Sequence, residues 1–407
     1  MSSTKISVSI SLGHENIRVG ILWFHIRKGR ESASFEYDKA WLNHPEKFAL
    51  EPALQLTEGE FHTNPNTVIF GAIGDSAPDR WGRVLMRRAE ARNTEGIPKT
   101  LFEMDYLLGV NDEARQGAMR FSFSEEPNIY LAPQKKTTIP PLIALPNLSS
   151  AIERFIEDDE TSEDLRLLLA PGSSLGGARP KATVRDQKGF LAIAKFSRKD
   201  DDYNVVVWEA VALTLAKQAG IQVPEWRLEN ILGKPVLIIH RFDRKAEQRI
   251  PFLSAMSMLG AKDNEQHSYL EIAYALAQRG ASPTEDMHAL WRRIVFNIMI
   301  ANTDDHLRNH GFLYERQRGW RLSPAYDMNP TPLEIKPRIL TTAIDFDNTA
   351  ADIDVAKSVA KDFRLSKKQA DDIINEVSTA VQTWKKIAID YGLSAQECNR
   401  MASAFKF

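Results

Sequence analysis

The pattern of hydrophobic and polar positions at the start of the chain predicts strands. Residues 17–26 and 32–37 mix β-branched and aromatic side chains with polar ones, and the segment 28–30 between them has the composition of a turn. Residues 5–37 are therefore expected to form strands, and the first part of the chain to be a β-rich domain.

The next pattern has the spacing of a helix and is followed by a stretch without a pattern. Over residues 79–92, the side chains of Trp81, Val84 and Leu85 fall on one helical face. Residues 126–147 then hold five prolines and almost no periodicity. Proline favours extended backbone, so this stretch is predicted to be a linker between the N-terminal domain and the rest of the chain.

The middle of the chain alternates between strand and helix patterns. A helix is predicted over residues 205–218, ended by Gly220 in a left-handed C-cap. The acidic run 157–160 is expected to lie in water on the surface, since bare runs of charge usually stay solvated. Strands are predicted at three places: 182–184, 190–196 and 235–239.

The pattern becomes mainly helical from residue 268 onward. Ser366 is suited to cap a long helix that runs to about Tyr391. Ser394 and Glu397 have the spacing of a capping box for a last short helix. The middle of the chain is thus expected to be α+β and the C-terminal part mostly α.

Composition and charge narrow the class of protein. A chain of 407 residues is long enough for roughly two or three subdomains. Its net charge of −2 gives no general attraction to nucleic acid, and Cys398, as the single cysteine, excludes an internal disulfide. No stretch approaches the roughly 20 apolar residues that span a bilayer, and the N-terminus lacks the apolar core of a signal peptide. We expect a cytoplasmic protein.

A loop of small residues at 173–181 is the first candidate for chemistry. The paired Gly176 and Gly177 let backbone N–H groups approach an anion closely, and Lys181 adds a positive charge. The loop is not a Walker A motif, which requires G-x-x-x-x-G-K-[ST]. Taken alone, the segment is more typical of an ordinary surface hairpin.

A lysine and a glutamate form the second candidate. Lys195 ends an apolar strand, and Glu209 follows 14 residues later on the predicted helix. A buried ammonium needs a counter-charge, and kinases use such a strand lysine with a helix glutamate to hold the α- and β-phosphates of the nucleotide. The alternative is a lysine that simply emerges at the end of a strand.

The most informative segment is the loop 302–309. Asp304 and Asn309 are five residues apart, which is the spacing of the aspartate and asparagine in the kinase catalytic loop. The aspartate would accept the proton of the attacking hydroxyl, and the asparagine would hold Mg²⁺. His306 lacks the spaced partners of a zinc site and is expected to orient the loop.

Asp327 completes the order of a kinase site. It follows a short strand pattern 18 residues after Asn309, where kinases carry a second magnesium ligand. Just before the helical part, residues 240–244 lie where a hinge between two lobes falls. This hinge segment either presents its backbone to adenine or is a salt-bridged strand end.

Taken together, these segments resemble the HipA family of toxin kinases across nearly the whole chain. The N-terminal part resembles the family's N-terminal subdomain in the residues 35–38, 41–42 and 78–82. The matching motifs of the later part are S-x-G-G-A-x-P-K at 174–181, Lys195, R-F-D-R at 241–244, N-T-D-D-H-x-x-N at 302–309 and Y-D at 326–327.

The resemblance implies an α+β fold with four parts. These are a β-rich N-terminal subdomain, a proline-rich linker, a mixed kinase N-lobe with the phosphate loop, and an all-helical C-lobe with the catalytic loop. Their expected bounds are 1–125, 126–147, 148–240 and 241–407.

The resemblance also implies roles for single residues in an ATP- and Mg²⁺-dependent serine/threonine protein kinase. Asp304 would be the catalytic base, with Asn309 and Asp327 as metal ligands. Ser174 falls on the family's autophosphorylated serine, and the adjacent Ser173 leaves the choice between the two open. The residues expected to contact ATP are Lys195, Lys181, Gly176, Gly177, His240, Phe242, Gln266 and Glu209.

Partners follow from the resemblance too. Members of the family phosphorylate aminoacyl-tRNA synthetases and are restrained by a small helix-turn-helix antitoxin, which also binds operator DNA. Two other functions stay open from the residues alone: a phosphotransferase for small molecules, and a catalytically silent scaffold or co-repressor. The presence of Lys195, Asp304 and Asp327 favours the kinase over the scaffold.

Overall fold

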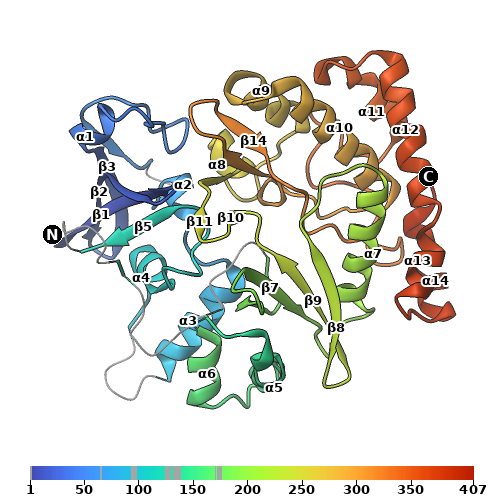
Figure 1. Cartoon of the computed structure of the whole chain (residues 1–407), viewed down its shortest axis with the longest axis horizontal. Helices are drawn as coiled ribbons and strands as arrows, with labels where there is room; N and C mark the ends of the chain where they lie inside the picture. Colours follow the sequence, from blue (N-terminus) through green and yellow to red (C-terminus); the bar gives the residue numbers. More distant parts are fainter. Residues whose placement is uncertain are drawn as a thin grey trace. The chain divides into compact units, whose positions relative to one another are not determined.

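The chain forms two compact units in the computed structural model (Figure 1). Unit 1 comprises Met1–Lys199 and Asn230–Leu253, and unit 2 comprises Asp200–Glu229 and Ser254–Phe407. Helix α7 (Val205–Gln218), which lies in the expected N-lobe, therefore belongs to unit 2. The structure describes the residues 2–64, 67–92, 99–123, 130–131, 139–169, 171 and 177–407.

Unit 1 begins with an antiparallel sheet in the order β4-β3-β2-β1-β5. The prediction of strands over residues 5–37 is confirmed, and Lys28 and Gly29 turn the chain between two of them in the left-handed region. The strands are β1 (Ser2–Leu12), β2 (Glu15–Arg27), β3 (Arg30–Tyr37), β4 (Glu60–His62) and β5 (Met119–Ser122).

Short helices follow this sheet in unit 1: α1 (Lys39–Leu42), α2 (Gly71–Gly74), α3 (Arg80–Ala91) and α4 (Glu103–Gly109). The predicted helix over 79–92 is confirmed as α3, with Asp79 as its N-cap. Trp81 and Leu85 are buried in the core and Val84 packs against the same cluster, so the expected face of the helix is the buried one.

The linker within the proline-rich stretch 126–147 is shorter than expected, because the last residues of the stretch belong to helices. Residues 126–129 and 132–138 lie outside the described residues. The end of the stretch is helical, because η1 (Leu142–Ala144) leads directly into α5 (Leu145–Ile156). Pro146 sits in the first turn of α5, where its missing N–H costs nothing.

The acidic run 157–160 does not lie wholly in water, and the prediction is wrong for Glu160. That carboxylate is buried and forms ion pairs with Arg88 at 3.1 Å and Arg92 at 3.0 Å. Arg88 in α3 and Arg92 at its C-cap supply the counter-charges that make this burial possible. Glu160 precedes α6 (Ser162–Leu169), which packs against α5 and α3.

The second sheet of unit 1 has the order β6-β7-β9-β8 and confirms the three predicted strands. Its pairs β6–β7 and β7–β9 are antiparallel, and the register places Lys195 opposite both Lys181 and Leu237. The strands are β6 (Lys181–Arg185), β7 (Leu191–Phe196), β9 (Lys234–His240) and β8 (Trp226–Ile231). Within β8 the chain passes from unit 2 back to unit 1. The elements β10 (Arg244–Lys245), β11 (Gln248–Arg249) and β12 (Phe252–Ser254) follow.

Unit 2 is mainly helical. The predicted helix over 205–218 is confirmed as α7 (Val205–Gln218), and Gly220 beyond it has a left-handed φ of 73°. The other helices are α8 (Ala255–Leu259), α9 (Tyr269–Arg279), α10 (Pro283–Met299), η2 (Leu307–Asn309), α11 (Ile353–Ser358), η3 (Ala360–Phe363), α12 (Lys367–Val381), α13 (Trp384–Asp390), α14 (Ala395–Met401) and η4 (Ala402–Phe405). In the part of the chain that the structure describes, none of the helices is long and apolar enough to cross a membrane.

Two details of unit 2 differ from expectation. The C-terminal part is not all-helical, because β13 (Gly311–Tyr314) and β14 (Trp320–Leu322) form a hairpin that buries Phe312 between the helices. The helix from Ser366 to about Tyr391 is two helices, α12 and α13. Thr383 separates them, because its hydroxyl donates to the carbonyl of Ala380 and competes with the helical hydrogen bonds. The α+β fold class itself is confirmed.

Candidate active site

The small-residue loop at 173–181 is only partly described. Ser173, Ser174 and Gly176 lie outside the described residues. Gly177 has a φ of 96°, a left-handed conformation that favours glycine. Lys181, expected to face phosphates, is instead buried at 2% exposure and forms an ion pair with Asp79, their Nζ and Oδ2 atoms being 2.8 Å apart.

The N-terminal motif at 78–82 thus meets the end of this loop within unit 1. Asp79 accepts a hydrogen bond from the amide of Gly82 at 2.8 Å, and the indole N–H of Trp81 donates to the carbonyl of Lys181 at 3.0 Å. Burial raises the pKa of the Asp79 carboxyl above its usual value, although the charge of Lys181 acts against this. The sequence showed the motif but gave no reason for its contact with Lys181.

Lys195 and Glu209 lie in different units. Lys195 is partly buried on β7 of unit 1, and Glu209 is buried on α7 of unit 2. The expected positions, a lysine on a strand and a glutamate on a helix, are confirmed. Their pairing stays a prediction.

The residues expected near adenine are also divided between the units. His240 ends β9, with Nε2 3.5 Å from a carboxylate oxygen of Asp186, and the Phe242 ring lies 6.4 Å from the ring of Phe252. Gln266 is exposed in unit 2. Adenine contact by these residues stays a prediction.

The side chains of the R-F-D-R segment form a buried salt-bridge network in unit 1. Asp243 accepts hydrogen bonds from Arg241 at 2.6 Å, from Arg244 at 2.8 Å and from the amide of Gly117 at 2.7 Å. Burial alone would raise the pKa of Asp243, but the charges of Arg241 and Arg244 hold it well below its usual value. Of the two alternatives for the segment, the structure supports the salt-bridged strand end for these side chains.

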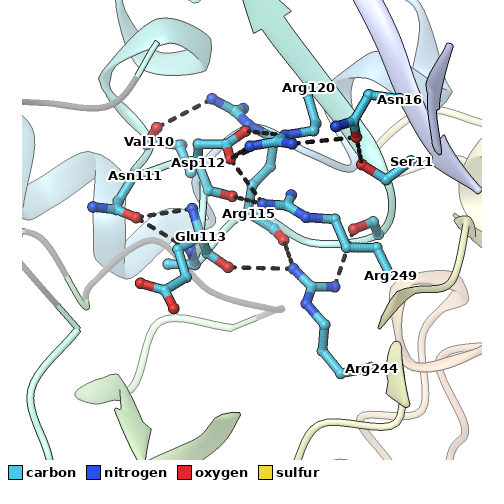
Figure 2. A network of polar contacts seen from close by, with 12 residues as sticks. Ser11, Asn16, Val110, Asn111, Asp112, Glu113, Arg115, Arg120, Arg244 and Arg249 are labelled. Atoms are coloured by element: carbon cyan, nitrogen blue, oxygen red, sulfur yellow. Dashed lines mark hydrogen bonds and ion pairs between the residues drawn. The ribbon is translucent and has the colours of Figure 1, made fainter. Parts of the chain in front are cut away.

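The network extends to the segment after α4 (Figure 2). Asp112 binds both Arg120 at 2.6 Å and Arg249 at 2.8 Å, while Arg244 donates to the backbone of Arg115. Burial lowers the pKa of the Arg115 guanidinium to about 9. These contacts tie the first sheet of unit 1 to the strands that follow β9, which is a structural role.

The loop expected to be catalytic lies in unit 2, directly after α10. The side chain of Asp304 is exposed, with Lys336 Nζ 3.8 Å away. Asn309 is buried, and its Nδ2 donates to the carbonyl of Asp304 at 3.1 Å. The Oδ1 atom of Asn309 is also buried but has no hydrogen-bond partner among the residues that the structure describes.

A buried aspartate that sequence reasoning missed supports this loop. Asp305 accepts hydrogen bonds from Asn297 at 2.7 Å, from the hydroxyl of Tyr269 and from His310 at 2.9 Å. Its backbone carbonyl accepts from the hydroxyl of Thr342 at 2.6 Å. Asp305 was adjacent to the expected base in the sequence, but only its burial shows that it anchors the loop.

The backbone of His306 helps to shape the same loop, and a role of its side chain stays a prediction. Its amide donates to the carbonyl of Asp304 at 2.9 Å, and its carbonyl accepts from the amide of Asn309 at 2.8 Å. Across the described ranges, no group of three or more His, Cys, Asp or Glu residues could hold a metal ion. A metal site here would need the mixed carboxylate and amide donors of the kinase pattern.

Asp327 lies beside this loop within unit 2. The hydroxyl of Tyr326 donates to the carbonyl of Arg308 at 2.8 Å, and the amide of Asn329 donates to Oδ1 of Asn302 at 3.3 Å. Asp327 itself has a φ of 57°, an uncommon conformation for a non-glycine residue and typical of functional sites. The structure therefore brings the segment of Asp327 to the loop of Asp304 and Asn309.

Comparisons with known proteins find relatives that are named as kinases. A protein named "Putative kinase" from Haemophilus influenzae is 30% identical over 135 residues, which cover 29% of this chain and 39% of that protein. "Putative kinase Y4dM" from Sinorhizobium fredii is 30% identical over 187 residues, covering 41% of this chain and 45% of that protein. The matches thus span less than half the length of these two relatives.

A solved structure and a family model cover more of the chain. The structure is that of the Shewanella oneidensis MR-1 toxin–antitoxin system HipA, HipB and its operator DNA, with a TM-score of 0.69 and 17% identity over 98% of this chain and 95% of that one. At this identity the likeness shows a common fold. The family model, described as the HipA-like C-terminal domain, matches residues 173–384, which is more than half of the chain. The chain therefore belongs to the family with the HipA-like C-terminal domain.

Proposed function

We propose that this chain is an ATP- and Mg²⁺-dependent serine/threonine protein kinase of the HipA toxin type. The observation that carries the proposal is the buried Oδ1 of Asn309, which has no hydrogen-bond partner among the described residues, in the same loop as the exposed carboxylate of Asp304. Buried polar atoms in native proteins are nearly always paired, so this acceptor is available to a ligand.

The donor chemistry fits magnesium. Asn309 offers an amide oxygen and Asp327 a carboxylate, and Mg²⁺ binds hard oxygen ligands of this kind through one or two carboxylates and the phosphates of the substrate. Asn309 and Asp327 would hold the ion, which would supply positive charge to neutralise the phosphates of the nucleotide. The hydrogen bond from Nδ2 to the carbonyl of Asp304 directs the amide oxygen of Asn309 away from that carbonyl.

Asp304 is suited to be the general base. Its carboxylate is exposed, so a hydroxyl of a protein substrate has access to it. The backbone of the loop is held by Asp305 and His306, which keeps the carboxylate in one place while the proton is transferred. Phosphoryl transfer depends mainly on such positioning.

Within unit 1, Lys195 would contact the phosphates of the nucleotide, and the loop with Gly176 and Gly177, which ends at Lys181, would cover them. For Glu209 of unit 2 the proposal keeps the role of counter-charge that the family resemblance implies. His240, Phe242 and Gln266 would contact adenine. The strand position of Lys195 and the helix position of Glu209 support these roles.

Regulation and partners are part of the same proposal. Phosphorylation of Ser174, or of Ser173, would add about −1.5 to −2 charges to the loop and repel the phosphates of a nucleotide. The solved complex of HipA with HipB and operator DNA supports a small helix-turn-helix antitoxin as partner, which would make most of the DNA contacts. An aminoacyl-tRNA synthetase in the cytoplasm is the candidate substrate.

The test is incubation of the purified chain with Mg²⁺ and γ-labelled ATP beside the variant Asp304→Asn, with the label mapped by mass spectrometry. Label on Ser173 or Ser174 in the wild type alone is the expected result. Label on a metabolite and on no protein of a cell extract would support a small-molecule phosphotransferase instead. ATP binding without any transfer would support the scaffold.

A further inference from the structure

Two residues of the N-terminal motif at 78–82 contact the same lysine, although the proposed reaction gives the motif no role. The carboxylate of Asp79 lies 2.8 Å from Nζ of Lys181, and the indole N–H of Trp81 donates to the backbone carbonyl of Lys181 at 3.0 Å. One contact fixes the side chain of the lysine and the other fixes its backbone. About a hundred residues of sequence separate the partners, so the contact depends on the tertiary fold.

The ion pair is shielded from water on both sides. The side chain of Asp79 is 7% exposed and that of Lys181 is 2% exposed. Desolvating two charges is costly, and removal of one partner leaves the other charge buried and unpaired. Such a pair adds little stability over apolar residues of similar size, so a role in specifying geometry accounts for it better than one in stability.

The position of Lys181 in the sheet explains what the pair specifies. Lys181 stands directly opposite Lys195 in the antiparallel register of β6 and β7. Directly opposed residues point to the same face, and like charges there repel each other. Asp79 gives Lys181 its own counter-charge, which offsets the repulsion between the ammonium groups of Lys181 and Lys195.

Lys181 is also the anchor of the small-residue loop. Its ammonium donates to the carbonyl of Gly177 at 3.2 Å, within the described end of the loop. The backbone on either side is held to the sheet, since Thr183 donates to the carbonyl of Pro171 at 2.8 Å and Phe196 donates to that of Pro180 at 3.1 Å. Movement of Lys181 would therefore move the end of the loop.

We propose that Asp79 is a positioning residue that holds Lys181, and through it the end of the loop at 173–181, in the geometry needed to bind the nucleotide. The inference rests on the proposed kinase function. It assigns the N-terminal motif to the phosphate-binding loop and does not make Asp79 a ligand of the nucleotide.

The test uses the full chain and three variants. Asp79→Asn removes the charge and retains the helix cap, because asparagine caps as well as aspartate. The double variant Asp79→Asn with Lys181→Met removes both charges, so that none is left buried alone. Glu103→Gln is the matched control. It weakens the ion pair between Glu103 and Arg83 of α3, the helix that Asp79 caps, and this pair does not involve Lys181.

The KM for ATP, kcat and the melting temperature are measured for each. We expect the KM for ATP to rise about tenfold to a hundredfold in Asp79→Asn and in the double variant, as for a misplaced binding group. The double variant and Glu103→Gln should melt near the wild-type temperature, and Glu103→Gln should keep the wild-type KM. An unchanged KM in a folded double variant, or an equal rise in Glu103→Gln, would overturn the proposal.

A second measurement separates this inference from the kinase proposal. If the wild type turns over no ATP, the kinase proposal fails, and amide hydrogen exchange over residues 177–185 without nucleotide still reports on the anchor. Faster exchange there in Asp79→Asn than in Glu103→Gln would support the anchoring of the loop by Asp79. Equal exchange in the two variants would overturn it.

Discussion

The side-chain amide of Asn309 donates a hydrogen bond to the backbone carbonyl of Asp304 at 3.1 Å, which closes the loop between the two residues. The bond uses the nitrogen of the amide and leaves the buried Oδ1 without a partner among the described residues. The carboxylate of Asp304 remains exposed at the other end of the same loop. One short segment thus carries both the amide oxygen proposed as a metal ligand and the carboxylate proposed as the base.

Replacement of Asp304 by asparagine should abolish activity without unfolding the chain. The carboxylate is exposed, so its loss should change the free energy of unfolding by less than about 0.5 kcal/mol. Loss of a general base should lower kcat by about 10²- to 10⁴-fold. Initial rates of phosphorylation and thermal melting measure the two effects. The exposed Asp362, changed to asparagine, is the matched control and should leave kcat unchanged.

Replacement of Asn309 by alanine should weaken the response to Mg²⁺. The variant loses the amide oxygen proposed as a metal ligand, and the loop also loses the hydrogen bond to Asp304. We expect the concentration of Mg²⁺ for half-maximal rate to rise at least about tenfold, because loss of a group that holds a metal commonly costs 10- to 100-fold in affinity. A titration of the rate with Mg²⁺ measures this. The same curve for Asn309→Ala and for the surface control Asn399→Ala would contradict the metal assignment.

Local patterns in the sequence were sufficient to predict much of the fold. The mixture of β-branched and aromatic residues with polar ones predicted the first strands, and the helical spacing of Trp81, Val84 and Leu85 predicted α3. These features depend on near neighbours in the chain. The break at Thr383 was not predictable in the same way, because the hydroxyl of one residue competes with the helix there.

The order of the candidate site residues along the chain was predictable from the sequence. The residues that hold them in place were not. The spacing of Asp304, Asn309 and Asp327 could be recognised from the sequence, and the structure brings their segments together in unit 2. Asp305 looks no different from Asp304 in a sequence, and only burial separates the anchor from the exposed acid. The partner of Lys181 was hidden for a similar reason, since Asp79 lies about a hundred residues away.

Replacement of Asp305 by alanine should destabilise unit 2. Burial by itself would raise the pKa of Asp305, but the charge and hydrogen bond of His310 and the hydroxyl of Tyr269 outweigh it and lower the pKa. A buried, paired carboxylate of this kind is worth about 3–5 kcal/mol when one partner is removed. Urea unfolding at neutral pH measures the loss.

The lowered pKa also fixes the pH at which this contribution disappears. It is present above the unfolded pKa of about 3.9 and is lost as the pH falls through the lower folded value. Wild-type chain should therefore lose stability in this acid range more steeply than Asp305→Ala. Parallel acid unfolding curves for the two proteins would show that Asp305 is not ionised in the folded state.

Glu51 should make unit 1 less stable as the pH rises toward neutrality. The carboxyl is buried at 7% exposure, and burial raises its pKa to about 7, while Ala72 donates its amide to the carboxyl and acts against this. The folded state thus favours the protonated form, whereas the unfolded chain ionises near pH 4.3. Stability from this group is complete below the unfolded pKa and is lost as the pH rises through about 7.

The variant Glu51→Gln should remove this pH dependence. Glutamine keeps an oxygen for the amide of Ala72 and carries no charge to bury. At pH 8 the wild type should have lost about 3 kcal/mol relative to pH 4, at 1.36 kcal/mol per pKa unit, and the variant should not share this loss. Urea unfolding of both proteins from pH 4 to 8 measures the difference. If the gap between the two free energies of unfolding stays constant with pH, Glu51 is ionised in the folded chain and its burial must be offset by a partner.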